Sequence, residues 1–120
     1  MVDMSNLDMS KPRRDIPRGM LDLLILQTLE TMGALHGYGI ARRIEQVAGG
    51  DRRLSQGAIY PALVRLQQQG WIRAKWGTSE TNRQVKFYEL TKAGTKQLHI
   101  GIAGWEESTA LMARFLEAKP

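Results

Sequence analysis

Three polar side chains near the start of one predicted helix have the chemistry to bind DNA. They are Ser55, Gln56 and Tyr60. A glutamine amide can pair bidentately with an adenine edge, while the two hydroxyl groups can reach a phosphate or a base edge. The first turn of a helix also points its backbone N–H groups and its positive dipole end outward, which attracts phosphate. These residues therefore predict a DNA contact, provided that the helix presents this face outward.

Three helices are expected ahead of residue 70. Apolar residues recur there with helical spacing, and a glycine follows each stretch and ends it. The three stretches cover residues 17–32, 37–48 and 55–69. In the third stretch, an apolar stripe must pack inward, and it consists of Ile59, Leu63 and Leu66. This packing turns the face with Gln56 and Tyr60 outward, at a width that the major groove accepts. Arg65, farther along, is expected to meet the DNA backbone.

After Gly70 the sequence alternates between apolar and polar residues. Residues 71–76 and 85–90 are rich in strand formers and flank a polar segment, which predicts a β-hairpin with a flexible tip. Four cations crowd this hairpin: Arg73, Lys75, Arg83 and Lys86. We expect a wing beside the third helix, with helix and wing presenting their cations on the same side, where they neutralise phosphates. The alternative is an ordinary charged strand edge that faces solvent.

A long helix is expected after Thr91, and it carries a heptad-like apolar seam. The seam consists of Leu98, Ile102, Trp105, Thr109, Met112 and Leu116. No later segment remains to cover the seam, so we expect it to bind a second copy of the chain. Gly101 and Gly104 also fall within this helix, where they either permit close approach of another helix or soften this one.

Composition narrows the function further. The net charge is +5, and residues 11–90 hold thirteen Lys and Arg against seven Asp and Glu. Such a balance is typical of a polyanion binder, although many soluble surfaces carry a similar charge. Cysteine is absent, and the two histidines, His36 and His99, are far apart in the chain. The acids are scattered and no catalytic or metal-binding motif appears, so we expect no catalytic residue, metal or cofactor.

The chain is expected to be mainly α with a small β-hairpin, in three parts. Residues 1–15 are polar and predict a flexible basic N-terminal arm, either a disordered tail or a phosphate contact. Residues 16–91 would form a winged helix-turn-helix, and residues 92–120 the C-terminal dimerisation helix. The sequence contains no bilayer-spanning apolar run and no secretory signal, so a cytoplasmic location without membrane contact is the expectation.

Several motifs resemble those of the PadR family of bacterial transcriptional regulators. They are GMLDLLIL at 19–26, HGYGI at 36–40, GAIYPAL at 57–63 with Leu66, GWI at 70–72 and FYELTKAG at 87–94. The resemblance implies a homodimeric winged helix-turn-helix repressor of the short-tailed branch, with its C-terminal helix in the dimer. It implies a phosphate contact by Tyr38 and entry of Tyr60 and its neighbour Gly57 into the major groove.

The resemblance also implies that a small aromatic or drug-like ligand releases the protein from DNA. In some short-tailed members the ligand stacks between tryptophans of the two terminal helices, and Trp105 stands at a similar position. The same side chain is expected in the dimer core, and the two roles are compatible.

Three functions compete at this point. The first is a DNA-binding repressor that acts as a homodimer on an inverted-repeat operator, with half-site centres about 34 Å apart. The second is a winged-helix module for protein or RNA contacts without specific DNA readout, which the glutamines at 67–69 would also suit. The third, an enzyme, has the least support because no catalytic motif is present.

Overall fold

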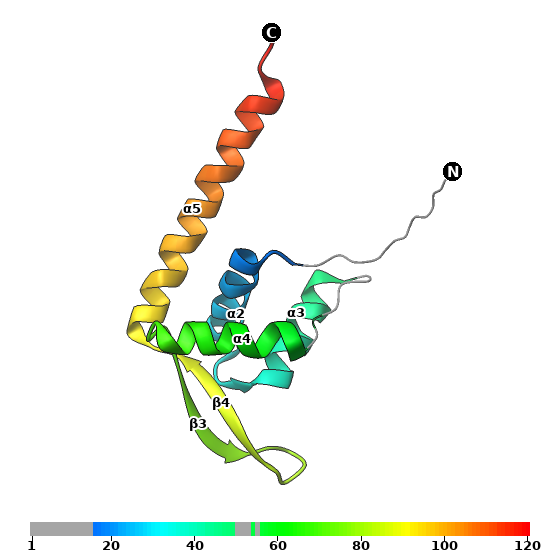
Figure 1. The fold of residues 1–120 in the computed structure, drawn as a ribbon, viewed down its shortest axis with the longest axis vertical. Helices are drawn as coiled ribbons and strands as arrows, with labels where there is room; N and C mark the ends of the chain where they lie inside the picture. The colour runs from blue at the N-terminus through cyan, green and yellow to red at the C-terminus, as the bar shows by residue number, and fades with distance from the viewer. Residues whose placement is uncertain (1–15, 50–53, 55) are drawn as a thin grey trace, which may run out of the picture.

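The computed structural model describes residues 16–49, 54 and 56–120. The predicted N-terminal arm and Ser55 lie outside the described residues. The elements, in chain order, are α2 (Arg18–Met32), β2 (Leu35–His36), α3 (Gly37–Ala48), α4 (Gln56–Gln68), β3 (Ile72–Thr78), β4 (Gln84–Leu90) and α5 (Lys92–Glu117). The fold is mostly helical with a small antiparallel sheet and a long last helix, which confirms the predicted fold class (Figure 1).

Helix α2 is the central helix of the core. Its apolar side chains recur at helical spacing, and Leu21, Ile25 and Leu29 are buried on that side. The helix begins after Pro17, whose carbonyl accepts the first helical hydrogen bond from Leu21. It ends at Gly33, where φ is +81°, a backbone conformation that glycine adopts without a Cβ clash.

Helices α3 and α4 pack on α2 as a helix-turn-helix. The imidazole of His36 caps α3, because its Nδ1 accepts a 2.9 Å hydrogen bond from the backbone N–H of Gly39. The stripe predicted for α4 is confirmed, since Ile59, Leu63 and Leu66 all lie in the core. Pro61 lies within α4 without ending it, because so near the helix start it removes few backbone hydrogen bonds.

The sheet has three strands in the order β2-β4-β3, all antiparallel. The predicted hairpin is present, and its strands extend to the pair formed by Thr78 and Gln84. The tip contains a hydrogen-bonded turn in which the Ser79 N–H donates to the Arg83 carbonyl over 2.8 Å. Asn82 in this turn has a φ of +63°. Strand β2, which the sequence pattern did not predict, is only two residues long.

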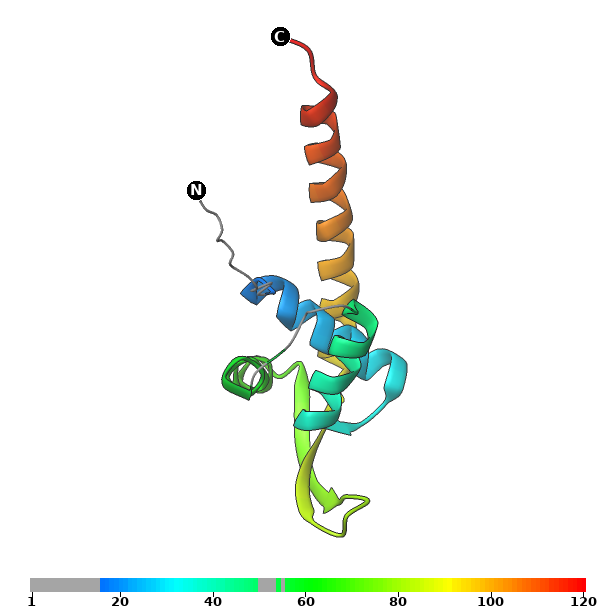
Figure 2. The same ribbon diagram turned by 90° about the vertical axis from the view of Figure 1, so that its right-hand side faces the viewer.

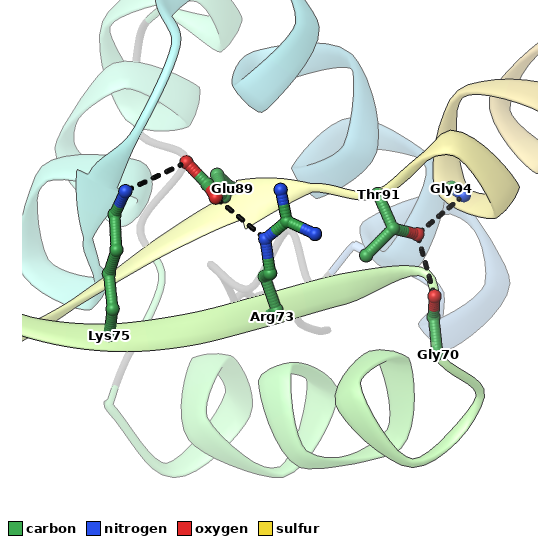
Figure 3. Close-up of polar contacts among 6 residues, drawn as sticks. All are labelled: Gly70, Arg73, Lys75, Glu89, Thr91 and Gly94. Atoms are coloured by element: carbon green, nitrogen blue, oxygen red, sulfur yellow. Dashed lines mark hydrogen bonds and ion pairs between the residues drawn. The ribbon is translucent and has the colours of Figure 1, made fainter.

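Helix α5 starts at a well-defined cap and then leaves the body of the protein. The Thr91 hydroxyl accepts from the Gly94 N–H over 3.0 Å and donates to the Gly70 carbonyl over 2.6 Å (Figure 3). Leu98, one turn further, is buried in the core. Beyond it the helix points away from the domain, at the end opposite the hairpin (Figures 1 and 2). In the described part of the chain, no helix combines the length and apolar character needed to cross a bilayer.

Candidate nucleic-acid interface

One groove gathers four of the predicted DNA-contacting residues. It has a volume of about 990 Å³ and lies between the start of α3, the exposed side of α4 and the β3–β4 hairpin, which we call the wing. Its walls include Tyr38, Tyr60, Arg83 and Lys86. We call this space the wing groove. Phenol hydroxyls and cations thus face one concave surface, which is the chemistry that binds a phosphate backbone.

Tyr38 stands at the start of α3 and is held by two neighbours. The Tyr38 ring stacks on the imidazole of His36, with 6.4 Å between the ring centroids. The imidazole also lies against the ring of Phe87 on β4, with 5.7 Å between the ring centroids. The Arg42 guanidinium lies 5.9 Å from the Tyr38 ring centroid, with Nη1 3.5 Å from the hydroxyl oxygen. Arg42 was not expected from the sequence as a contact residue. Its position could have indicated this role, because Arg42 follows Tyr38 by one helical turn on the outer side of the helix.

Tyr60 of α4 lies against the start of α3 because residue 37 is a glycine. A Cβ on Gly37 would stand 3.1 Å from Cε1 of the Tyr60 ring, so the close approach depends on the absence of a side chain. Tyr88 of β4 lies behind it, and burial raises the pKa of the Tyr88 phenol, with a smaller contribution from Tyr60. Gln56 is the first residue of α4, and Gly57, the second residue of this helix, is exposed.

The wing carries its cations on two faces. The register pairs Trp76 with Lys86 and Lys75 with Phe87, so Lys75 and Lys86 project from opposite sides of the hairpin. Arg83 and Lys86 line the wing groove, whereas Lys75 is not among its described lining residues. The wing cations thus do not all project from one face, although Phe87, which shares the face of Lys75, also lines the groove.

Lys75 and Arg73 instead share one carboxylate on the other face of the wing. Nε of Arg73 lies 2.7 Å from Oε2 of Glu89, and Nζ of Lys75 lies 3.5 Å from Oε1 (Figure 3). The hydrogen bond from Arg73 lowers the pKa of Glu89, and the positive charge of Lys75 adds to the effect. These two cations are thus partly neutralised within the protein.

Arg65 is also engaged within the protein. Its guanidinium binds the carboxylate of Asp22 on α2 through two hydrogen bonds of 2.6 and 3.4 Å. Arg65 therefore joins α4 to the central helix, and this ion pair takes the place of the expected contact with the DNA backbone.

The seam predicted on α5 is divided between the core and the surface. Leu98 is only 1% exposed and anchors the helix to the domain, and Ile102 is partly buried against the core. Trp105, Met112 and Leu116 are exposed. Leu111 and Phe115, which were not expected on the seam, are also exposed on α5, with Phe115 at the edge of the seam and Leu111 on the same side of the helix as Ile100. The free part of α5 thus presents a wider apolar surface than the predicted seam.

A second groove, of about 350 Å³, lies between α2 and α5. Trp105, Trp71 and Leu23 are among the side chains that line it. Gly101 faces it, and a Cβ there would come within 2.8 Å of Cδ1 of Leu23, so this glycine allows α2 and α5 to pack closely. Among the described residues, no group of three or more His, Asp or Glu is arranged to hold a metal ion.

Three helices, a wing beside the third and a long last helix define a winged helix-turn-helix protein with an appended helix. The model of the transcriptional regulator PadR-like family matches residues 25–100. The chain belongs to this family, as the motifs in the sequence indicated. PadR-like regulators bind DNA.

Two curated relatives are similar to part of the chain. A 37.1 kDa protein of transposon Tn4556 from Streptomyces fradiae is 44% identical over 66 residues, which are 55% of this chain and 17% of that protein. The negative transcriptional regulator PadR of Bacillus subtilis is 31% identical over 67 residues, which are 56% of this chain and 37% of that protein. The chain thus matches well under half of the length of these curated relatives.

A solved structure resembles nearly the whole fold. A transcriptional regulator from Clostridium thermocellum aligns with a TM-score of 0.74 and 27% identity, over 83% of this chain and 96% of that one. The matched family consists of transcriptional regulators and not of enzymes, in agreement with the prediction from the sequence.

Proposed function

We propose that this chain is a sequence-specific DNA-binding repressor that acts as a homodimer. The observation that carries the proposal is the wing groove, where Tyr38, Tyr60, Arg83 and Lys86 converge from three separate elements. Repression is supported by the Bacillus subtilis relative, which is named a negative transcriptional regulator.

In the proposed complex, α4 enters the major groove with its N-terminal part. Gln56 reads a base edge through its amide, and Gly57 and Tyr60, which follow it in α4, enter the groove with it. The proposed contact by Ser55 rests on the sequence alone. The start of α3 faces the sugar-phosphate backbone, where Tyr38 and Arg42 bind phosphate. Arg83 and Lys86 of the wing neutralise further phosphates. Lys75 has no part in this arrangement, because it pairs with Glu89 and is not among the described lining residues of the wing groove.

The homodimer is supported by the free half of α5. A single protomer leaves Trp105, Met112 and Leu116 exposed there, and a contiguous apolar surface of this kind marks an interface. A two-fold axis between the α5 helices would place two α4 helices on one face of a duplex. The operator is then an inverted repeat with half-site centres about 34 Å apart.

Release by a small aromatic ligand is supported by the groove between α2 and α5. The groove is lined mainly by apolar side chains and includes two tryptophans, Trp71 and Trp105. A planar aromatic ligand would stack on the exposed indole of Trp105, beside the helix that forms the dimer. Ligand binding there would change the separation of the two α4 helices and so weaken the fit to the operator.

Selection of bound duplexes from a random-sequence pool tests the proposal. We expect the wild-type chain to select an inverted repeat, and affinity that does not depend on sequence at moderate salt would contradict it. Arg42→Gln should weaken binding and lower the salt slope by about one unit. Arg43→Gln is the matched control, because this neighbouring arginine is not among the described residues of the wing groove. A protein-binding module would instead retain its affinity for its partner when Arg83 and Lys86 are changed to Gln.

A further inference from the structure

An exposed tryptophan of the wing, Trp76, has no role assigned so far, and it pairs with Lys86 of the wing groove. Trp76 of β3 is 66% exposed, which is unusual for so large an apolar side chain. Lys86 lies directly opposite it on β4, with Nζ 5.7 Å from the centroid of the Trp76 ring. This cation–π contact keeps the two side chains together at the surface.

The pair lies on the wing face that continues from the core. The next pair of that face toward the domain is Ala74 with Tyr88, and Tyr88 is buried behind Tyr60 at the wing groove. Because side chains two residues apart in a strand share a face, Trp76 and Lys86 extend the same surface outward. Lys86 itself lines the groove, so the indole stands at the rim of the groove.

The domain does not cover this indole, and the proposed dimer would not cover it either. The wing projects from one end of the molecule, and the free half of α5 projects from the other (Figures 1 and 2). A second copy bound through α5 therefore lies far from Trp76. The charge beside the indole comes from Lys86, with Arg83 in the tip, and a cationic rim of this kind complements a polyanion.

We propose that Trp76 and Lys86 act as one clamp on the sugar-phosphate edge of the duplex, beside the segment that α4 enters. The Lys86 ammonium neutralises one phosphate, and the indole of Trp76 packs flat on the adjoining deoxyribose. The clamp rests on the proposed DNA-binding function and adds Trp76, which was not expected from the sequence, as an affinity determinant. A contact to sugar and phosphate strengthens binding and sets the register of the protein without reading base sequence.

Binding of fluorescein-labelled duplex, selected by the wild-type chain from a random pool, tests the clamp. We expect Trp76→Ala to weaken binding about tenfold, close to the effect of losing one well-packed aromatic contact. Trp76→Phe should keep the affinity within about threefold, because a smaller aromatic ring still packs on the sugar. Lys86→Gln should weaken binding and lower the salt slope by about one unit. The double variant should be little weaker than either single variant if the pair works as a unit.

Lys75→Gln is the matched control, since it removes the same charge from the other face of the same hairpin. Its affinity should stay within about twofold of wild type, because Lys75 already pairs with Glu89. Quenching of intrinsic tryptophan fluorescence by the duplex should also shrink in Trp76→Phe, which keeps Trp71 and Trp105. Circular dichroism on each variant confirms that the fold is retained.

Two outcomes separate the clamp from the function on which it rests. If Trp76→Ala binds the selected duplex as wild type does, the clamp is overturned and DNA binding stands. Undiminished quenching in Trp76→Phe also overturns the clamp, because the signal then comes from another tryptophan. If the wild-type chain selects no duplex at all, both the clamp and the proposed function are overturned.

Discussion

Arg65 of α4 and Asp22 of α2 form a bidentate ion pair. Nη2 lies 2.6 Å from Oδ1 and Nε lies 3.4 Å from Oδ2. Each side chain is 26% exposed, so the pair is partly removed from water. The fork geometry of a guanidinium on a carboxylate fixes orientation as well as distance. The contact therefore sets how α4, the helix proposed to enter DNA, lies on the central helix of the core.

Asp22→Asn should lower the free energy of unfolding by about 1–2 kcal/mol. The variant leaves the Arg65 cation partly buried without its counter-charge, and partial exposure keeps the loss below that of a fully buried pair. Urea unfolding at one fixed protein concentration measures the difference. Glu30→Gln, which changes an exposed acid on the same helix, should change the free energy of unfolding by less than about 0.5 kcal/mol.

The same ion pair predicts that Arg65 acts on stability and not on DNA contact. Arg65→Gln should unfold more easily, yet its DNA binding should keep the wild-type salt slope at a temperature where it is folded. A salt slope lower by about one unit would instead mean that Arg65 meets a phosphate.

Three glycines of α5 should respond differently to alanine. At Gly94 a Cβ would collide with the Trp71 carbonyl oxygen and lie 2.8 Å from its carbonyl carbon. These are backbone atoms, which cannot relieve the collision by a change of rotamer as a side chain can. Gly94→Ala should therefore destabilise the protein by about 2–3 kcal/mol. At Gly101 the neighbour is the flexible end of Leu23, so the change should stay within about 1 kcal/mol.

Gly104 provides the control for this series, because a Cβ there would have nothing within 4 Å in the protomer. Gly104→Ala should stabilise the protein by about 0.5–1 kcal/mol through the helix propensity of alanine. Thermal melts of all three variants at equal concentration test the order. A marked loss of stability in Gly104→Ala would show that another helix approaches this position in the dimer.

The wing should lose stability in acid through Glu89. Hydrogen bonding by Arg73 lowers the pKa of this carboxyl below its ordinary value of 4.5 in the folded protein. A lowered pKa means that the charged form stabilises the fold at pH values above 4.5, and that this stabilisation is lost as the pH falls below 4.5 and through the lowered value. The melting temperature of wild type should therefore exceed that of Glu89→Gln at pH 6, and the difference should shrink toward about pH 3. A difference that stays constant over this range would contradict the assignment.

The fold could be read from the sequence wherever the spacing of apolar residues decides burial. Ile59, Leu63 and Leu66 recur at helical intervals, so the inward face of α4 was determined before any partner was known. The hairpin could likewise be predicted, because the apolar residues change after Gly70 from helical spacing to the alternation of a strand. Strand β2 was not, because two residues are too short to show alternation, and they form a strand only by pairing with β4.

The candidate site was harder to predict because its side chains depend on partners far away in the chain. Arg65 finds its counter-ion 43 residues earlier, and no local pattern signals that contact. Lys75 and Lys86 are both cations on adjacent strands, and only the hairpin register shows that they project from opposite faces. Tyr38 and Tyr60, which the sequence predicts as DNA contacts, both line the wing groove, and Arg42 joins them because of its position on α3.

The free half of α5 offers the sharpest test of the proposed homodimer. Met112 and Leu116 are 58% and 79% exposed in the protomer, and they lie on the same side of the helix as Trp105. Changing both to Asp places charges in the proposed interface, where they could not be paired, so the dimer should dissociate. Light scattering after size exclusion should then report a protomer of 13.5 kDa in place of a species of twice that mass.

Ile100→Ser is the matched control for this dimer test. Ile100 is also an exposed apolar residue of α5, 54% accessible, but it lies on the opposite side of the helix from the seam. This variant should remain dimeric. Affinity for an inverted-repeat duplex should fall sharply in the double Asp variant, because each protomer would then bind one half-site alone and lose the gain from linked binding. A double Asp variant that stays dimeric would place the interface elsewhere on the protein.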